Sequence, residues 1–189
     1  MESMSEKFLM ASGKLQTLCY KYEIERNLRT KDYAGFQLLG INDYSGQGTA
    51  LVGPLNVHWK EKGYCSAEEW RQFCSPFVLL ARFPRFVYTN QETLHVPLEA
   101  YNALWADIAP SSVRFSIMDE SKHVWRQGSF NNNGIHLGKN TQIGVVEWKL
   151  DSIKAPTKLT LYTYFGKDVM NHWDFWVYRV PSELNSSDD

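Results

Sequence analysis

The most constraining feature of this sequence is a change of hydrophobic period at Pro84. Before Pro84, apolar residues recur at helical spacing or stand in short unbroken runs, whereas after it they alternate with polar residues. Alternation is typical of strands with one buried face, and about seven such segments follow. Seven short strands within roughly 95 residues predict an immunoglobulin-like β-sandwich over residues 84–181. The Cys–Trp–Cys spacing of antibody domains is missing, and residues 182–189 form a polar tail.

The part before Pro84 predicts an α/β arrangement. Residues 5–29 carry a helical stripe, residues 35–41 form an apolar run, and residues 66–69 form a capping box that opens a short second helix. A helix followed by a short turn and an apolar strand matches a parallel sheet better than a hairpin. We therefore predict that residues 1–83 are the terminal helix–strand–helix elements of a TIM-type barrel, so that the whole chain is mainly β with an α/β N-terminal part. The stripe consists of Phe8, Leu15, Leu18, Cys19, Tyr22 and Leu28.

Charge and composition argue against several classes of partner. The net charge is −1 and no Lys/Arg stripe is present, so we expect no nucleic acid partner. No apolar run approaches the roughly 18 residues that span a bilayer, so we expect no membrane partner. The three cysteines and five histidines do not stand at metal-ligand spacing, and we expect no metal and no cofactor. The N-terminus lacks a signal-peptide pattern, and localisation stays open, a periplasmic or secreted parent included.

The candidate site follows the apolar run, where a polar, glycine-rich loop extends to Gly53. Asn42 and Asp43 would stand at the carboxyl end of a buried strand, which is where α/β architectures place chemistry. Asp43 could orient a substrate hydroxyl, or the pair could bond neighbouring backbone in an Asx-type turn; the residues alone leave these alternatives even. The loop around Gln47 is too short for a phosphate loop and lacks its lysine.

Residues 15–53 resemble the end of the catalytic barrel in large bacterial proteins related to glycoside hydrolase family 2, the β-galactosidase- and β-glucuronidase-like enzymes. The most specific part is residues 35–53. The likeness continues through Trp59, residues 62–64, residues 68–69 and residues 73–76, up to residues 80–82. Over the sandwich it is a matter of pattern only. The resemblance implies that residues 5–29 are the seventh barrel helix, residues 35–41 are the eighth strand, and an accessory immunoglobulin-like domain follows.

This register implies that the chain holds no catalytic residue. Glycoside hydrolysis uses two carboxylates that flank the scissile bond, and in the family they come from the fourth and seventh strands, upstream of Met1. The resemblance leaves Asn42, Asp43 and Gln47 as substrate-binding candidates. Leu38 and Leu39 stand where many family members carry a tryptophan that forms the pocket floor, which leaves the sugar open.

Two functional hypotheses follow, with a purely structural domain as a third. The first is the C-terminal part of a family 2-like glycosidase that acts in carbohydrate processing and is inactive without its upstream catalytic barrel. The second is a stand-alone carbohydrate-binding module whose aromatics stack on sugars. The first requires an exposed apolar face on residues 5–29 and 35–41, and implies self-association through it. The second requires a line of solvent-facing aromatics, with candidates Trp105, Trp125, Trp148, Trp173 and Trp176.

Overall fold

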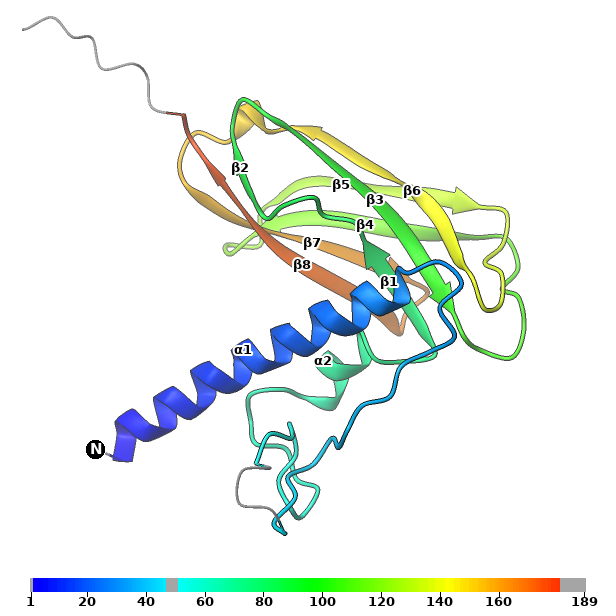
Figure 1. Cartoon of the computed structure of the whole chain (residues 1–189). Coiled ribbons are helices and arrows are strands. Elements are labelled where there is room, and N and C mark those ends of the chain that lie inside the picture. Colours follow the sequence, from blue (N-terminus) through cyan, green and yellow to red (C-terminus); the bar gives the residue numbers. More distant parts are fainter. Residues whose placement is uncertain (1, 47–50, 181–189) are drawn as a thin grey trace, which may run out of the picture. The chain divides into compact units, whose positions relative to one another are not determined.

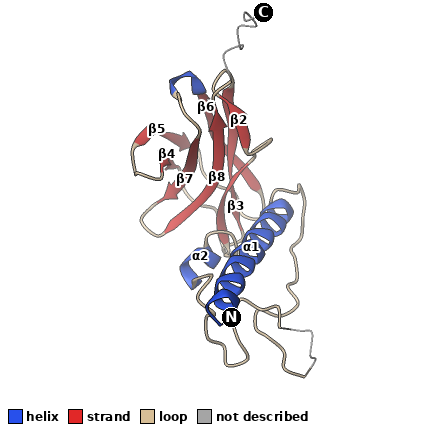
Figure 2. Cartoon of the chain, turned by 90° about the vertical axis from the view of Figure 1, so that its left-hand side faces the viewer, coloured by secondary structure: helices blue, strands red, loops and turns tan. Residues whose placement is uncertain are grey.

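The computed structural model describes residues 2–46 and 51–180. The chain divides into two compact units, Met1–Val78 and Leu79–Asp189. The boundary that the change of hydrophobic period predicts, at Pro84, lies six residues beyond the end of the first unit. The strands lie almost entirely in the second unit, while the first consists of helix and loop up to β1 (Figure 2). The predicted polar tail, residues 182–189, lies outside the described residues.

The first unit begins with one long helix, α1 (Glu2–Leu28), drawn in blue in Figure 1. The predicted N-terminal helix is thus confirmed. Its buried face carries Thr17, Lys21, Ile24, Glu25 and Leu28, at spacings of three, four and one. The apolar stripe is largely the opposite face, because Phe8, Leu15, Leu18 and Cys19 are exposed.

Tyr64 packs directly on α1 at Gly13. A Cβ at Gly13 would lie within 2.6 Å of three carbons of the Tyr64 ring, so only glycine admits the ring there. The Tyr64 hydroxyl lies 2.9 Å from the carbonyl oxygen of Gly53 and 3.0 Å from Oε1 of Gln16, and it can donate to either. This tyrosine therefore connects α1 to the loop that ends at Gly53.

The predicted barrel strand over residues 35–41 is not present in the structure, and no barrel end is shown. These residues are irregular, Gln37 is exposed, and Leu39 is 96% exposed. Only an isolated parallel bridge between Asn42 and Leu55 follows. A parallel strand needs hydrogen-bonding neighbours and a covered face. Among the described residues, nothing supplies either to residues 35–41, so their apolar side chains do not impose a strand.

The second helix, α2 (Ala67–Arg71), begins where the capping box predicts it. The Ser66 hydroxyl accepts a hydrogen bond from the Glu69 backbone N–H at 3.2 Å. A carboxylate oxygen of Glu61 accepts from the Ala67 backbone N–H at 2.9 Å, so a second free N–H of this helix end is also satisfied.

The second unit is a β-sandwich of two sheets (Figure 1). The three-stranded sheet has the order β1-β3-β6, with β1 (Phe77–Ala81), β3 (Thr93–Asn102) and β6 (Asn140–Lys149). The five-stranded sheet has the order β2-β8-β7-β4-β5, with β2 (Val87–Thr89), β4 (Ser111–Asp119), β5 (Val124–Asn132), β7 (Thr157–Phe165) and β8 (Val169–Tyr178). A 3-10 turn, Leu150–Ser152, follows β6. β2 runs parallel to β8, while the β3–β6, β4–β5, β4–β7 and β7–β8 pairs are antiparallel.

The alternating pattern defines the core of the sandwich. The predicted inward set of β3, Leu94, Val96, Leu98 and Ala100, is buried throughout. In the five-stranded sheet, β4, β7 and β8 bury every second side chain in the same way. The predicted hairpin around residues 119–122 joins β4 to β5. The immunoglobulin-like sandwich is therefore confirmed as the fold of this unit.

Candidate functional site

Asp43 lies in a closed crossing of two chain segments, which we call the Asp43 crossing (residues 41–43, 53–55 and Lys62). Its Oδ1 accepts hydrogen bonds from the Gly53 backbone N–H at 3.0 Å and from Nζ of Lys62 at 2.8 Å. The segments also pair directly, since the Asp43 N–H donates to the Leu55 carbonyl at 3.0 Å. A Cβ at Gly53 would lie within 2.7 Å of backbone atoms of Asn42 and Asp43, so the crossing requires glycine.

These contacts favour the structural interpretation of the predicted pair. Asp43 is buried and Asn42 is half-buried, and the Asn42 amide donates to the Asp43 carbonyl at 3.1 Å. The role of Asn42 and Asp43 towards a substrate stays a prediction, and sequence reasoning missed Lys62, nineteen positions away, as the counter-ion of Asp43. Neither residue spacing nor motif gives a signal for that pair. Gln47, the third predicted site residue, lies outside the described residues.

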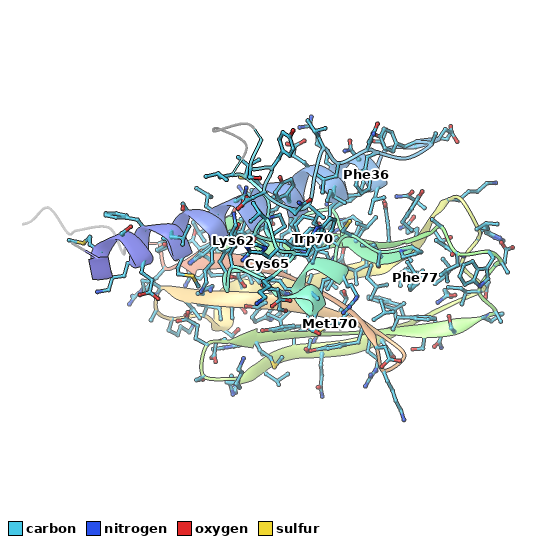
Figure 3. The ribbon with its side chains drawn as sticks, turned by 90° about the horizontal axis from the view of Figure 1, so that it is seen from below. Phe36, Lys62, Cys65, Trp70, Phe77 and Met170 are labelled. Carbon is cyan, nitrogen blue, oxygen red and sulfur yellow. The ribbon has the colours of Figure 1, made fainter. Side chains whose placement is uncertain are left out.

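A pocket of about 240 Å³ opens beside the crossing without including the predicted pair. Its walls are mainly apolar and come from Ile41, Pro54, Leu55, Cys65 and Trp70, with Glu61, Ser66 and Arg71 supplying polar groups. Burial raises the pKa of the Cys65 thiol, which keeps it protonated and unreactive at neutral pH. Figure 3 shows Lys62 and Cys65 next to each other, and Cys65 and Trp70 both line the pocket.

A second hollow, of about 340 Å³, runs along α1. It lies between α1 and Phe36, Gln37 and Leu38 of the irregular segment, and the α1 side includes Cys19, Tyr20 and Glu23. The residues predicted to form the last barrel strand therefore line an open groove on the helix.

A buried charge cluster anchors the inner face of α1. Nζ of Lys21 lies 2.6 Å from a carboxylate oxygen of Glu25, and the Arg29 guanidinium lies 3.6 Å from the other oxygen. The Lys21 ammonium also lies 5.6 Å from the centre of the Phe73 ring. Burial lowers the pKa of Lys21, and the Glu25 carboxylate opposes that change. Because Glu25 is fully buried beside its two cations, it is not accessible to a substrate.

The candidate tryptophans of the sandwich differ sharply in exposure. Trp105 is 91% exposed and Trp176 is 37% exposed, whereas Trp173 belongs to the core. Trp125 and Trp148 are half-buried, with ring centres 6.2 Å apart, and the Trp125 indole N–H donates to Asp119 at 2.9 Å. Only the first two therefore offer a free aromatic surface.

Two further searches of the described residues gave negative results. In residues 2–46 and 51–180, no group of three or more His, Cys, Asp or Glu side chains is placed to hold a metal ion. Within the same ranges, no helix has the length and apolarity that crossing a membrane requires.

Residues 92–179 match a family described as a domain of unknown function (DUF8488). No curated protein matches the chain. Among solved structures, the chain is similar to the α-2-macroglobulin of E. coli, with 19% identity and a TM-score of 0.43 over 54% of this chain and 6% of that one. It is also similar to a β-glucosidase from Erythrobacter marinus, with 13% identity and a TM-score of 0.41 over 53% of this chain and 15% of that one.

A third similar structure is the CARDB domain of a Pyrococcus furiosus protein, with 8% identity and a TM-score of 0.40 over 55% of this chain and 94% of that one. The chain thus spans only a small part of the first two proteins. Likeness at this level carries no argument about activity, and no match establishes a family 2 identity. Together the findings give an immunoglobulin-like β-sandwich of unknown function.

Proposed function

We propose that this chain is the C-terminal part of a family 2-like glycoside hydrolase, with both catalytic carboxylates in an upstream barrel. The observation that carries the proposal is an uncovered apolar surface on the first unit, which we call the α1 apolar face. On α1 it comprises Met4, Phe8, Leu9, Leu15 and Leu18, and the same unit has further exposed apolar side chains at Phe36, Leu39, Leu51 and Val52.

The helix has a mixed distribution of side chains, with polar residues on its buried face and apolar residues on its exposed face. A surface helix normally buries apolar residues and exposes polar ones, yet α1 buries Thr17, Lys21 and Glu25 and exposes Phe8 and Leu15. A large apolar side chain contributes about 1.5–3 kcal/mol when it is fully buried. The nine are 38–96% exposed, so together they forgo on the order of 10 kcal/mol, which is as much as the whole stability of a typical domain. An apolar surface of this kind is expected to be buried against another part of a larger protein.

The position of the face supports a barrel as its cover. The exposed apolar side chains of the first unit include Phe36 and Leu39, which belong to the run that resembles the eighth barrel strand of the family. In a parallel barrel that run would be paired on both edges and packed on both faces, and the outer helix would be packed as well. In this proposal the upstream barrel strands pair with residues 35–41 and order them. The upstream barrel then explains both the resemblance to the family and the uncovered apolar face.

The chain's own glutamates support an upstream location for the catalytic pair. Glu25 is enclosed by Lys21 and Arg29, and Glu23 is an exposed residue on α1, which in the proposed register lies outside the barrel. Asp43 is occupied by Lys62 and Gly53. In the parent enzyme this crossing shapes the rim of the sugar pocket without taking part in proton transfer.

The test compares the chain with its longer product. The chain should be expressed alone and together with the sequence that precedes its first codon in frame, and both should be assayed on a panel of aryl-glycosides. We expect hydrolysis by the longer product only. Matched substitution of its two upstream carboxylates by amides should abolish that hydrolysis. Hydrolysis by the 189-residue chain, or a longer product that lacks further barrel strands, contradicts the proposal.

A second candidate function is a carbohydrate-binding module. It is favoured by aromatic side chains on the outer face of the five-stranded sheet, where Trp176, His172 and Tyr162 follow one another along β8 and β7. The Tyr162 ring stacks on His172 and on Tyr164, with ring centres 5.7 and 6.3 Å apart. Retention of the chain by polysaccharides, with loss in Trp176→Ala and Tyr162→Ala and no glycosidase activity in the longer product, would favour this function over the first.

A further inference from the structure

Trp105 projects from the sandwich on a short connection between β3 and β4, which we call the Trp105 loop (residues 103–110). The indole is 91% exposed, while most large aromatic side chains of this unit are buried or half-buried. The neighbouring Ala103 and Ala106 are too short to cover its ring faces. Single exposed apolar side chains are common on protein surfaces, so the indole points to a ligand only together with the groups beside it.

The loop is held in place by a buried asparagine at its base. Asn102 is fully buried, and its amide donates to the carbonyls of Ala106 at 3.0 Å and Ile135 at 3.1 Å. Its side-chain oxygen accepts from the Leu104 N–H at 3.0 Å. Ile108 and Ile135 exchange two backbone hydrogen bonds of 2.9 Å, which tie the Trp105 loop to the connection between β5 and β6. The indole is thus presented on a fixed support.

Hydrogen-bonding groups accompany the indole on the same pair of loops. One oxygen of Asp107 accepts from the Leu137 N–H at 2.7 Å, and the other lies 3.0 Å from Nδ1 of His136. Both side chains remain more than half exposed. These bonds lower the pKa of Asp107, so the carboxylate is ionised at neutral pH and has further acceptor capacity. Nε2 of His136 is on the far side of the ring from Asp107.

The size of the apolar area decides what kind of partner fits. Only Leu137 joins Trp105 as an exposed large apolar side chain on the two tied loops. A stable protein interface buries about 800 Å² on each partner and surrounds its central aromatic with further apolar contacts. A sugar ring needs one flat aromatic face and a few polar groups for its hydroxyls, which is what the two loops supply.

We propose that the Trp105 loop is a glycan-binding subsite, at which Trp105 stacks on the apolar face of a pyranose ring and Asp107 and His136 bind its hydroxyls. The choice of a glycan as ligand rests on the proposed function. The subsite holds a polysaccharide away from the pocket where the parent enzyme cleaves it. It therefore deepens the proposed function by naming a second point of substrate contact.

The test is affinity electrophoresis of the whole chain in gels that contain soluble galactan, galactomannan, xyloglucan or mixed-linkage β-glucan. We expect at least one polysaccharide to retard the chain, and Trp105→Ala to weaken the binding more than tenfold. Trp105→Tyr should restore part of it, because a tyrosine ring also stacks. Trp59→Ala is the matched control, an exposed tryptophan of the first unit, and should leave binding unchanged.

Other outcomes overturn the proposal. Absence of retardation in all four gels, or equal retardation of Trp105→Ala and the unchanged chain, rules out the subsite. A change of oligomeric state in Trp105→Ala, measured by sedimentation velocity, would make the loop a protein contact instead. The failure of this test is separate from that of the proposed function, because the longer product can hydrolyse aryl-glycosides, which are too short to need the subsite, whether or not the loop binds polysaccharide.

Discussion

Asp43 and Lys62 form an ion pair of 2.8 Å whose side chains are only 8% and 16% exposed. The pair joins two segments that share few backbone hydrogen bonds. This part of the chain has no strand pairing among its described residues, so the ion pair helps to hold the segments together. Its carboxylate also receives the Gly53 N–H, so one oxygen serves as the acceptor for both segments.

Asp43→Ala should therefore destabilise the first unit. Removing one member of a buried pair leaves the other charge uncompensated, and we expect a loss of about 3 kcal/mol. Hydrogen exchange of peptides that span residues 41–64 measures the loss locally. Lys31→Ala is the control, because that lysine forms only an exposed pair with Asp32. Equal exchange in both variants would show that the crossing does not depend on the ion pair.

Gly13→Ala should destabilise the chain although alanine favours helix. The new Cβ overlaps the Tyr64 ring, and such overpacking costs about 1–3 kcal/mol against about 1 kcal/mol of gain in helix propensity. Urea denaturation followed by circular dichroism measures the difference, with Ser12→Ala on the exposed side of the same turn as control. If Gly13→Ala proves more stable than the unchanged chain, the packing of Tyr64 on α1 is wrong.

Charges on the α1 apolar face should make the chain less prone to self-association. We expect the double variant Phe8→Lys, Leu15→Lys to sediment as a smaller species than the unchanged chain, because both side chains are exposed and apolar. Ser12→Lys adds charge at an exposed polar position of α1 and should change little. An unchanged chain that is already monomeric at high concentration would contradict this prediction and weaken the case for a missing cover.

The carboxyl group of Asp119 should have a pKa far below that of an ordinary aspartate. The Ser121 hydroxyl, the Trp125 indole N–H, and the backbone N–H groups of Ser121 and His123 donate to its carboxylate and lower its pKa to about 2. Since the folded pKa lies below the unfolded value of about 3.9, this turn stabilises the hairpin above pH 4. The contribution is lost as the pH falls towards 2. NMR titration of the carboxyl carbon measures the midpoint, and Trp125→Phe should raise it while Trp148→Phe should not.

Asn102→Ala should loosen the Trp105 loop and destabilise the sandwich. Three hydrogen bonds of a fully buried amide are lost, for which we expect about 2–4 kcal/mol from the groups left unpaired. Thermal unfolding measures the loss, and faster hydrogen exchange over residues 103–110 shows its local part. Asn133→Ala, an exposed asparagine of the facing connection, is the control. Equal melting of the two variants would mean that Asn102 does not hold the loop.

The sandwich was predictable because the alternation within the sequence of a strand shows which of its side chains are buried. Alternation places Leu94 and Leu98 inward whatever their partners are, and residues 119–122 mark a turn before any pairing is known. The same parity also separates Trp173 from Trp176 in β8, since three positions along a strand lead to the opposite face. Treating both as equal candidates for sugar stacking overlooked that signal.

The first unit was less predictable for a physical reason. Helix α1 follows from local sequence, but a parallel strand at residues 35–41 depends on neighbours that the described residues do not provide. The pairing of Asp43 with Lys62 depends on how the chain crosses itself, which no spacing reveals. Asn42 and Asp43 follow the apolar run, but no strand ends there, and the structure gives them backbone partners; their role towards a substrate stays a prediction.

Because of the position of Asn102, the stability of the sandwich and the ligand contacts of the Trp105 loop can change independently. The hydrogen bonds of the Asn102 side chain hold the base of the Trp105 loop, so the fold depends little on the side chains at positions 103–105. Substitutions at the tip can therefore alter what the loop contacts without loss of stability. A sandwich built in this way can serve as a scaffold on which ligand preference diverges between relatives while the framework remains the same.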